Sequence, residues 1–458
     1  MKRFFLLFSV FALFPVFKSE AQKPKEPLTR ILFILDASNS MTTEWKGKVK
    51  INTAREVLAK MVDSLEQIEN VQVGLRVYGH QSPVPPQNCN DTRLEIPFDD
   101  NNAEKIRIYL NYIRPKGTTP IANSLKACAD DFPPCENCRN IVVLITDGIE
   151  ACDGDPCEIS LALQKKGIIL KPFVIGVGLE VDLKSQFECI GSYYDATSPE
   201  SFASSLNDVI TQVMSKSSAQ VDLYDINKKP LETNVNMTFY DAFSGRMIHN
   251  YIHTLNAAGK PDTLNLDPMI TYKIKVHTIP PVFSQEFKLK PDEHLIVGID
   301  APQGQLILTS PANPFEKEVN FIVRKAGDNQ TLDVQYLNST EKYIVGKYDI
   351  EVLTFPRIYF KDVEIKQSTK TELKVPQLGC LTVYPETPGF GSIYKINDSG
   401  DVEWMVNLDS QAKKEIFYFI PGNYKVVLRK TDRKSTLSTF EKTFTMEAGK
   451  ALSINLNY

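Results

Sequence analysis

Short apolar runs and amphipathic segments alternate through the first half of the chain. Residues 31–35 (ILFIL) form a continuous apolar run of strand length bounded by polar residues, which predicts a strand buried on both faces of a sheet. Residues 140–146 (NIVVLIT) predict a second strand of this kind. In residues 52–65, apolar side chains recur at spacings of three and four, which predicts an amphipathic helix packed on that sheet.

The other elements of this half continue the alternation. Further strands are predicted at residues 71–78, 92–96, 168–177 and 192–195, and further helices at residues 101–113, 121–129, 160–166, 183–190 and 199–214. Strands that alternate with helices are typical of an α/β doubly wound, Rossmann-like fold with a mostly parallel sheet. We therefore expect one such domain over residues 28–217.

The pattern changes after a polar stretch at residues 215–220 (SKSSAQ), which we interpret as a linker. Three segments with strand alternation start 76 residues apart, at Tyr272, Tyr348 and Tyr424. A constant spacing of that size predicts three similar β domains in tandem. Short strands separated by turn residues favour all-β sandwiches of the immunoglobulin or prealbumin-like kind. We place these domains at residues 218–303, 304–378 and 379–458.

Residues 1–21 have the features of a signal peptide. Residues 2–3 (KR) give a positive start, residues 4–17 are almost entirely apolar, and the small residues Ser19 and Ala21 predict cleavage after Ala21. The apolar run is too short to span a bilayer comfortably, which argues against an uncleaved anchor, and no later segment predicts a transmembrane helix. We expect an exported protein that is periplasmic, extracellular or held at the cell surface.

Composition narrows the function classes without identifying one. The 458 residues are 42% hydrophobic and 24% charged, as in ordinary globular proteins, and their number predicts several domains. The formal net charge of −4 is small for this length, so the charge does not predict binding to nucleic acid.

Export makes the eight cysteines candidates for disulfides, because oxidising compartments preserve them. Seven fall in the first half, so one of these is unpaired or reaches Cys380 or another chain. The pairing stays open. Cys135-x-x-Cys138 invites a zinc or redox interpretation, but a matching Cys/His pair is missing, which favours structural disulfides. The seven are Cys89, Cys128, Cys135, Cys138, Cys152, Cys157 and Cys189.

Oxygen-bearing side chains follow both buried strands. Asp36, Ser38 and Ser40 come directly after the first strand, and Asp147 comes directly after the second. Thr119 precedes a predicted helix on the same rim of a doubly wound sheet, where such folds bind ligands. Oxygen donors suit Mg²⁺, or Ca²⁺ or Mn²⁺. Two carboxylates only neutralise a divalent ion, which could then accept a carboxylate oxygen from a partner.

Simpler interpretations compete at each position. The two serines alone could be turn or helix-capping residues, and Thr118 competes with its neighbour as a ligand. The acidic loop 152–157 could hold a second cation, but we favour a turn closed by a disulfide between its cysteines. His249 and His253 have the spacing of a helical metal pair but lie in a strand pattern, and His80 fits a packed loop residue.

Three motifs together resemble the metal-ion-dependent adhesion site of von Willebrand factor A domains. They are Asp-x-Ser-x-Ser at 36–40, Gly-x-Thr at 117–119 and Thr-Asp-Gly at 146–148, in the family's order and strand contexts. The resemblance covers about residues 28–217, and the loop after the third motif looks like exported bacterial members. It leaves out the β-rich half and identifies no ligand.

The resemblance implies a role for each residue at the rim. Ser38 and Ser40 would coordinate the metal directly, Thr119 directly or through water, and Asp36 and Asp147 often through water. The family's metal site binds an acidic group of a partner, which implies a partner protein or surface ligand that offers a carboxylate.

Enzyme signatures are missing from the sequence. HExxH, GxSxG and GxxxxGK[ST] do not occur, no GxGxxG follows the first strand, and no His or Glu inside the motifs could act as a general base. We expect a non-enzymatic, cation-dependent binding or adhesion protein. A structural subunit of an envelope or surface assembly is the second hypothesis, and a metal-dependent hydrolase is the third.

Overall fold

The computed structural model describes residues 27–135, 137–175, 190, 194–196, 198–215, 217–311, 319–385 and 388–456. The chain forms two compact units, Met1–Val209 and Ile210–Tyr458. The predicted signal peptide at residues 1–21, most of the predicted helix at 183–190, and Cys189 lie outside the described residues.

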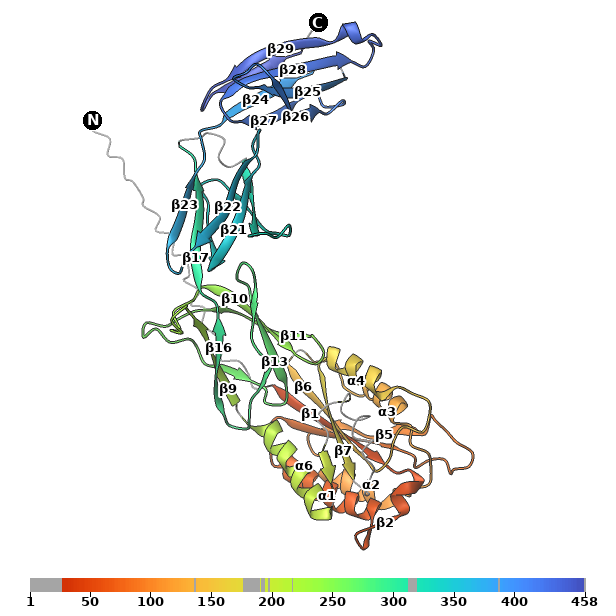
Figure 1. The fold of residues 1–458 in the computed structure, drawn as a ribbon. Helices are drawn as coiled ribbons and strands as arrows, with labels where there is room; N and C mark the ends of the chain where they lie inside the picture. Colours follow the sequence, from red (N-terminus) through yellow and green to blue (C-terminus); the bar gives the residue numbers. More distant parts are fainter. Residues whose placement is uncertain are drawn as a thin grey trace, which may run out of the picture. The chain divides into compact units, whose positions relative to one another are not determined.

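The first unit is built on a six-stranded sheet with the strand order β5-β4-β1-β6-β7-β8 (Figure 1). Neighbouring strands are parallel except β5, which pairs with β4 in antiparallel fashion at the edge. The strands are β1 (Leu28–Asp36), β4 (Val71–Tyr78), β5 (Thr92–Asp99), β6 (Cys138–Thr146), β7 (Ile168–Ile175) and β8 (Tyr194–Ala196). A short hairpin of β2 (Glu44–Trp45) and β3 (Lys48–Val49) follows the 3-10 helix η1 (Asn39–Thr42).

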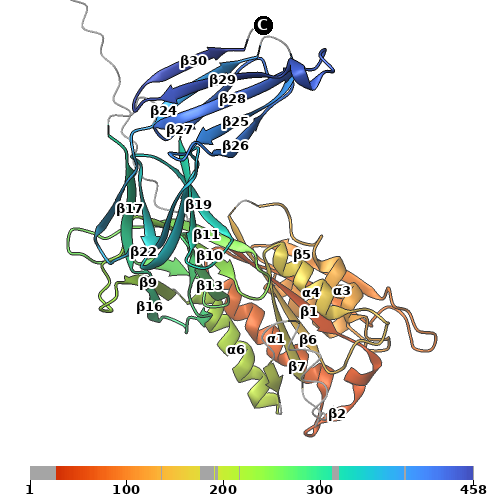
Figure 2. The same cartoon turned by 45° about the horizontal axis from the view of Figure 1, so that its top comes forward.

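Helices cover both faces of this sheet, with α3 and α4 on one face and α1 and α2 on the other (Figures 1 and 2). They are α1 (Lys50–Glu66), α2 (Ala103–Tyr112), α3 (Ile121–Cys128) and α4 (Pro156–Lys165), and α6 (Pro199–Met214) crosses the boundary between the units. Leu32 and Ile34 of β1 share a buried cluster with Leu125 of α3 and Leu163 of α4. The continuous apolar run is explained, because β1 is buried on both faces.

The strand order positions the site. After β1 the chain adds β4 and β5 on one side, then crosses to add β6, β7 and β8 on the other. The crevice of a doubly wound sheet opens where the strand order reverses, at the carboxyl ends of the two central strands. Here those are the ends of β1 and β6.

The second unit consists of sheets in three successive sets, each with a three-stranded sheet and a larger sheet of five strands in the first set and four strands in the second and third. The first set is β12-β9-β16 with β11-β10-β13-β14, where β15 also pairs with β13; the second is β20-β17-β23 with β19-β18-β21-β22; the third is β27-β24-β30 with β26-β25-β28-β29. In every set the first and last strands pair in parallel. The predicted fold class, an α/β domain followed by β-sandwiches, is confirmed.

The strand bounds follow the sets. The first contains β9 (Ser217–Tyr224), β10 (Val235–Asp241), β11 (Met247–His253), β12 (Leu264–Leu266), β13 (Thr271–Val276), β14 (Val282–Phe283), β15 (Phe287–Lys288) and β16 (His294–Asp300). The second contains β17 (Gln303–Thr309), β18 (Asn320–Lys325), β19 (Thr331–Tyr336), β20 (Thr340–Ile344), β21 (Gly346–Val352), β22 (Ile358–Ile365) and β23 (Lys370–Lys374). The third contains β24 (Gly379–Tyr384), β25 (Gly389–Ile396), β26 (Val402–Leu408), β27 (Glu415–Phe419), β28 (Gly422–Lys430), β29 (Phe440–Met446) and β30 (Ala451–Asn455), with the 3-10 helix η3 (Thr436–Ser438) before β29.

The spaced tyrosines occupy equivalent strands of the three sets, β13, β21 and β28, and are buried. The Tyr348 hydroxyl donates to the carbonyl oxygen of Ile344 (2.6 Å), and Tyr424 donates to Ile420 in the same way (2.7 Å). A buried phenol needs such a partner, and the second and third domains supply it in the same way.

The polar stretch after α6 is not a linker as predicted. Residues 217–220 belong to β9, where Ser217 and Ala219 are buried and Ser218 and Gln220 are partly exposed. The Ser217 hydroxyl donates to the carbonyl oxygen of Lys290 (2.8 Å), so a polar side chain fits a buried strand position. The polar composition of residues 217–220 concealed their strand alternation.

Among the helices of the described ranges, none combines the length and apolar character that crossing a bilayer requires.

Candidate metal centre

The predicted residues lie at the carboxyl ends of the two central strands. Asp36 ends β1, Ser38 and Ser40 follow in the turn that includes η1, and Asp147 follows β6. Because β1 and β6 pair in parallel and in register, their ends meet at one edge of the sheet. Asp36, Ser38 and Asp147 are almost completely buried, whereas Ser40 is exposed.

Three side-chain oxygens converge at this edge. The hydroxyls of Ser38 and Ser40 lie 2.9 Å apart, and the Ser40 hydroxyl donates to Asp147 Oδ1 at 2.7 Å. In an octahedral Mg²⁺ site with ligands at about 2.1 Å, neighbouring ligand oxygens are about 3.0 Å apart. The spacing of these oxygens therefore fits adjacent ligand positions around one such ion.

Thr119 reaches the same edge from the loop before α3. This loop runs alongside the turn after β1, because Ser38 and Gly117 form a parallel bridge and the Asn39 amide donates to the Gly117 carbonyl (2.9 Å). A Cβ on Gly148 would lie 4.0 Å from Thr119 Oγ1, so the threonine hydroxyl lies beside the residue that follows Asp147.

Asp36 is held by donors on both carboxylate oxygens. Its Oδ1 accepts the Ser38 amide at 2.7 Å, and its Oδ2 accepts the Thr146 hydroxyl at 2.7 Å. Thr146 in turn accepts the Tyr78 hydroxyl at 3.0 Å. Burial, followed by the charge of Asp147, raises the pKa of Asp36 to about 6, and burial keeps the pKa of Tyr78 well above its ordinary value. Tyr78 thus stays a neutral donor at the end of a chain that orients Asp36.

Two glycines let the loops of the site approach each other. Gly79 has φ +70°, and a Cβ there would lie 2.7 Å from the Thr118 carbonyl oxygen and 2.8 Å from Ser38 Cα. A Cβ on Gly117 would lie 2.8 Å from Gly79 Cα. Any larger residue would separate the turn after β1 from the loop that carries Thr119.

A lysine that the sequence analysis missed belongs to the same site. Lys50 Nζ donates to Asp147 Oδ2 at 2.7 Å, and the two side chains are 6% and 0% exposed. Two signals could have identified it: Lys50 is in register with Ala54 and Leu58 on the buried face of α1, and a cation in the first turn of a helix opposes the helix dipole. A buried lysine at such a position requires an acidic partner.

The donor set suits a hard cation. Within the part of the chain that the structure describes, no group of three or more His, Cys, Asp or Glu residues could hold a metal. The centre instead combines two carboxylates with hydroxyls, a set that does not suit Zn²⁺. These residues fit Mg²⁺, Ca²⁺ or Mn²⁺.

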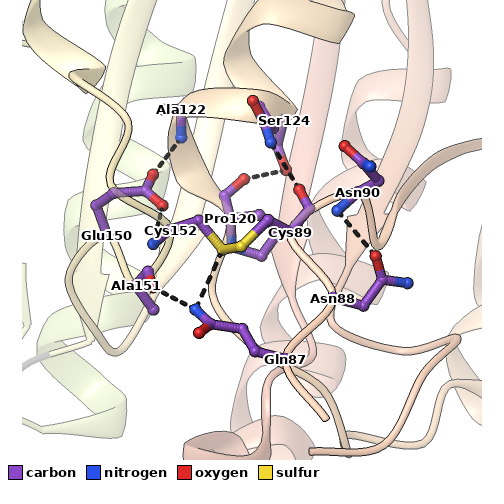
Figure 3. Close-up of a disulfide and its surroundings, with 11 residues drawn as sticks. Gln87, Asn88, Cys89, Asn90, Pro120, Ala122, Ser124, Glu150, Ala151 and Cys152 are labelled. Atoms are coloured by element: carbon purple, nitrogen blue, oxygen red, sulfur yellow. Dashed lines mark hydrogen bonds between the residues drawn. A yellow bond between two sulfur atoms is a disulfide. The ribbon is translucent and has the colours of Figure 1, made fainter.

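A disulfide secures the loops around the centre. Cys89 and Cys152 are bonded, which links the loop after β4 to the loop after β6 (Figure 3). Gln87 donates to the Ala151 carbonyl on the same loop. Glu150 accepts the amides of Cys152 (2.8 Å) and Ala122, so the loop that follows Asp147 is also attached to the start of α3 (Figure 3).

This pairing corrects the prediction for the acidic loop 152–157. Its two cysteines do not bond to each other, because Cys152 bonds to Cys89 and Cys157 lies in the first turn of α4. Cys157 is disulfide-bonded as well. Asp155 caps α4 by accepting the amides of Cys157 (2.8 Å) and Glu158 (3.3 Å). The cap gives this aspartate a structural role.

The other cysteines and histidines that the sequence analysis singled out, apart from Cys189, lie in the described structure. Cys135 and Cys138 form a disulfide, which the sequence analysis favoured over a zinc site. Cys128 and Cys380 are buried thiols. His249 and His253 lie on strand β11, as predicted, and His253 Nε2 lies 2.9 Å from the Val221 carbonyl oxygen. His80 Nε2 lies 2.7 Å from Glu95 Oε1, in agreement with a hydrogen-bonding loop residue.

Loss of the Cys89–Cys152 bond should destabilise the first unit by up to about 4 kcal/mol, because it closes a segment of 63 residues. Cys89→Ala with Cys152→Ala tests this by urea unfolding, followed through the buried Trp45 in a Trp404→Phe background. The matched control is Cys135→Ala with Cys138→Ala, whose sequence separation is 3 and whose expected loss is below about 2 kcal/mol. Equal losses in the two pairs would refute the prediction.

Comparison with known proteins gives one family and several relatives. The family model for the von Willebrand factor type A domain matches residues 31–216. The "uncharacterized protein YwmC" of Bacillus subtilis (strain 168) is 32% identical over 211 residues, which cover 43% of this chain and 91% of that protein. A second protein of the same strain, "uncharacterized protein YwmD", is 26% identical over 198 residues, covering 41% of this chain and 86% of its own.

Solved structures resemble the chain more distantly. The conserved hypothetical protein BatB from Bacteroides thetaiotaomicron is 19% identical with a TM-score of 0.34, covering 40% of this chain and 98% of its own. The pilus adhesin SpaC from Lactobacillus rhamnosus GG is 9% identical with a TM-score of 0.35, covering 94% of this chain and 88% of its own. Likenesses of that size carry no information about a ligand.

Proposed function

The chain belongs, through residues 31–216, to the von Willebrand factor type A domain family, and on that basis we propose that it is an exported, cation-dependent binding protein. Asp36, Ser38, Ser40, Thr119 and Asp147 would hold Mg²⁺, or Ca²⁺ or Mn²⁺, at the carboxyl ends of β1 and β6. The bound ion supplies an electrophilic position for an acidic group of a partner protein or surface ligand.

One observation carries this proposal. The Ser40 hydroxyl lies 2.9 Å from the Ser38 hydroxyl and 2.7 Å from Asp147 Oδ1, and both distances suit neighbouring ligands of one hard cation. Ser40 is exposed, so the group of oxygens faces solvent on one side, while the donors behind Asp36 keep its carboxylate oriented. An orienting set of donors behind a ligand is typical of metal centres.

Two further features support export and binding. The disulfides Cys89–Cys152 and Cys135–Cys138 favour an oxidising compartment, in line with the predicted signal peptide. The three β-sandwiches after the A-type domain would extend the chain or add contact surfaces.

A permanent subunit of an envelope or surface assembly is the second candidate, since the same site could attach a lasting partner.

Capture from the envelope of the source organism tests the proposal. The immobilised chain should bind a partner with Mg²⁺, release it with EDTA and bind it again when Mg²⁺ returns. Ser40→Ala should lose the Mg²⁺-dependent part, and Ser64→Ala, an exposed serine on α1, is the matched control. Capture that is identical in both variants would reject the proposal. Capture that survives EDTA once formed would favour the assembly subunit, and turnover of a substrate without a partner would favour a hydrolase.

A further inference from the structure

The candidate metal centre contains a charge that opposes a bound cation. We propose that the ammonium group of Lys50, buried 2.7 Å from Asp147 Oδ2, weakens cation binding at this site and strengthens the attraction of the bound cation for a carboxylate. This inference rests on the proposed function, because it concerns the affinity and ligand preference of the same centre.

Asp147 divides its two oxygens between two partners. Oδ2 accepts the Lys50 ammonium at 2.7 Å, whereas Oδ1 accepts the Ser40 hydroxyl at 2.7 Å. The Ser38 hydroxyl lies 2.9 Å from that of Ser40, so the group of converging oxygens includes Oδ1 and not the oxygen that Lys50 holds. Lys50 can therefore keep its ion pair while a cation binds to Oδ1 and the hydroxyls.

The fold holds Lys50 at this place. It is the first residue of α1, its amide donates to the Thr43 carbonyl (3.1 Å), and its side chain is 6% exposed. Ala54 and Leu58 continue its helix face into the core. Water is excluded from most of the ammonium group, so its field is screened much less than that of a surface lysine.

The charge of the site follows from its three ionisable groups. Asp36 and Asp147 as carboxylates contribute −2, and Lys50 reduces this to −1. A divalent cation bound there leaves a net charge of +1, where the same site without Lys50 would be neutral. The excess positive charge repels the cation and favours an anionic group at any ligand position open to solvent.

Calorimetry of two small probes tests this inference. Wild-type and Lys50→Met chains are titrated with Mg²⁺ at pH 7, and the Mg²⁺-saturated proteins are then titrated with acetate. We expect Lys50→Met to bind Mg²⁺ at least about 10-fold more tightly and acetate more weakly. Lys48→Met is the matched control: it removes the same charge two residues away, from a side chain that is 54% exposed, and should change Mg²⁺ affinity less than about twofold.

A second variant guards against misfolding. Lys50→Gln removes the charge but keeps an amide donor for Asp147, and it should shift both affinities in the same directions as Lys50→Met. One outcome would overturn the role of Lys50 and leave the proposed function standing: the wild type binds Mg²⁺, and both Lys50 variants bind it no more tightly than the wild type does. Tight Mg²⁺ binding by the variants alone would support the role of Lys50 but contradict a wild-type metal centre. Absence of binding in every chain would overturn both.

Discussion

Asp147→Ala will destabilise the first unit by about 3–5 kcal/mol in the absence of divalent ions. The substitution leaves the buried ammonium of Lys50 without its carboxylate partner at 2.7 Å, and removing one partner of a buried ion pair carries a cost of this size. The measurement is urea unfolding in EDTA, with the fluorescence of Trp45 in a Trp404→Phe background as the signal.

The matched control removes both charges at once. Lys50→Met combined with Asp147→Ala leaves no buried charge unpaired, so the double variant should recover most of the stability that Asp147→Ala loses. A double variant as unstable as Asp147→Ala alone would show that the ion pair is not the cause. This result also matters for binding studies, because Asp147→Ala would lose capture through unfolding as well as through a lost ligand.

Ser38→Ala combined with Ser40→Ala will abolish the stabilisation of the first unit by Mg²⁺. At a concentration about 100 times its dissociation constant, Mg²⁺ should add about 2.7 kcal/mol to the free energy of unfolding of the wild-type unit. The double variant lacks both hydroxyls that converge with Asp147 Oδ1, so Mg²⁺ should add almost nothing. Unfolding midpoints with and without Mg²⁺ measure the difference.

These serines suit the test because neither removal leaves a buried charge unpaired. Ser40 is exposed. Asp147, the only charged partner of Ser40 within the described structure, keeps its contact with Lys50 in the variant. The Ser38 side chain also hydrogen-bonds the Asp36 carboxylate, so the free energy of unfolding of the variant in EDTA should lie below the wild-type value by up to about 3 kcal/mol. Equal Mg²⁺ stabilisation of both proteins would locate any cation site elsewhere.

The sequence could predict the parts of the site that follow buried strands. Asp36 and Asp147 come directly after continuous apolar runs, and parallel strands bring such positions to one edge. The tyrosine spacing predicted the repeated β domains for a similar reason, since equal folds place equal residues at equal intervals. Local pattern and strand polarity suffice for these inferences.

The parts that the sequence could not predict depend on which loops meet. Lys50 reaches Asp147 only because α1 starts where it does, 97 residues away along the chain. Cys89 meets Cys152 because the loops after β4 and β6 lie on the same rim, with β1 between those strands. Residues 217–220 are polar in composition, and only their pairing within β9 shows that they form a strand.

Equilibrium binding of Mn²⁺ tests the central claim most directly, because this ion can be counted by its paramagnetic signal. The account predicts one Mn²⁺ per wild-type chain, displaced by excess Mg²⁺, and none in the chain with Ser38→Ala and Ser40→Ala. Saturable binding that is the same in both proteins, or no saturable binding in the wild type, would contradict a metal centre at the ends of β1 and β6.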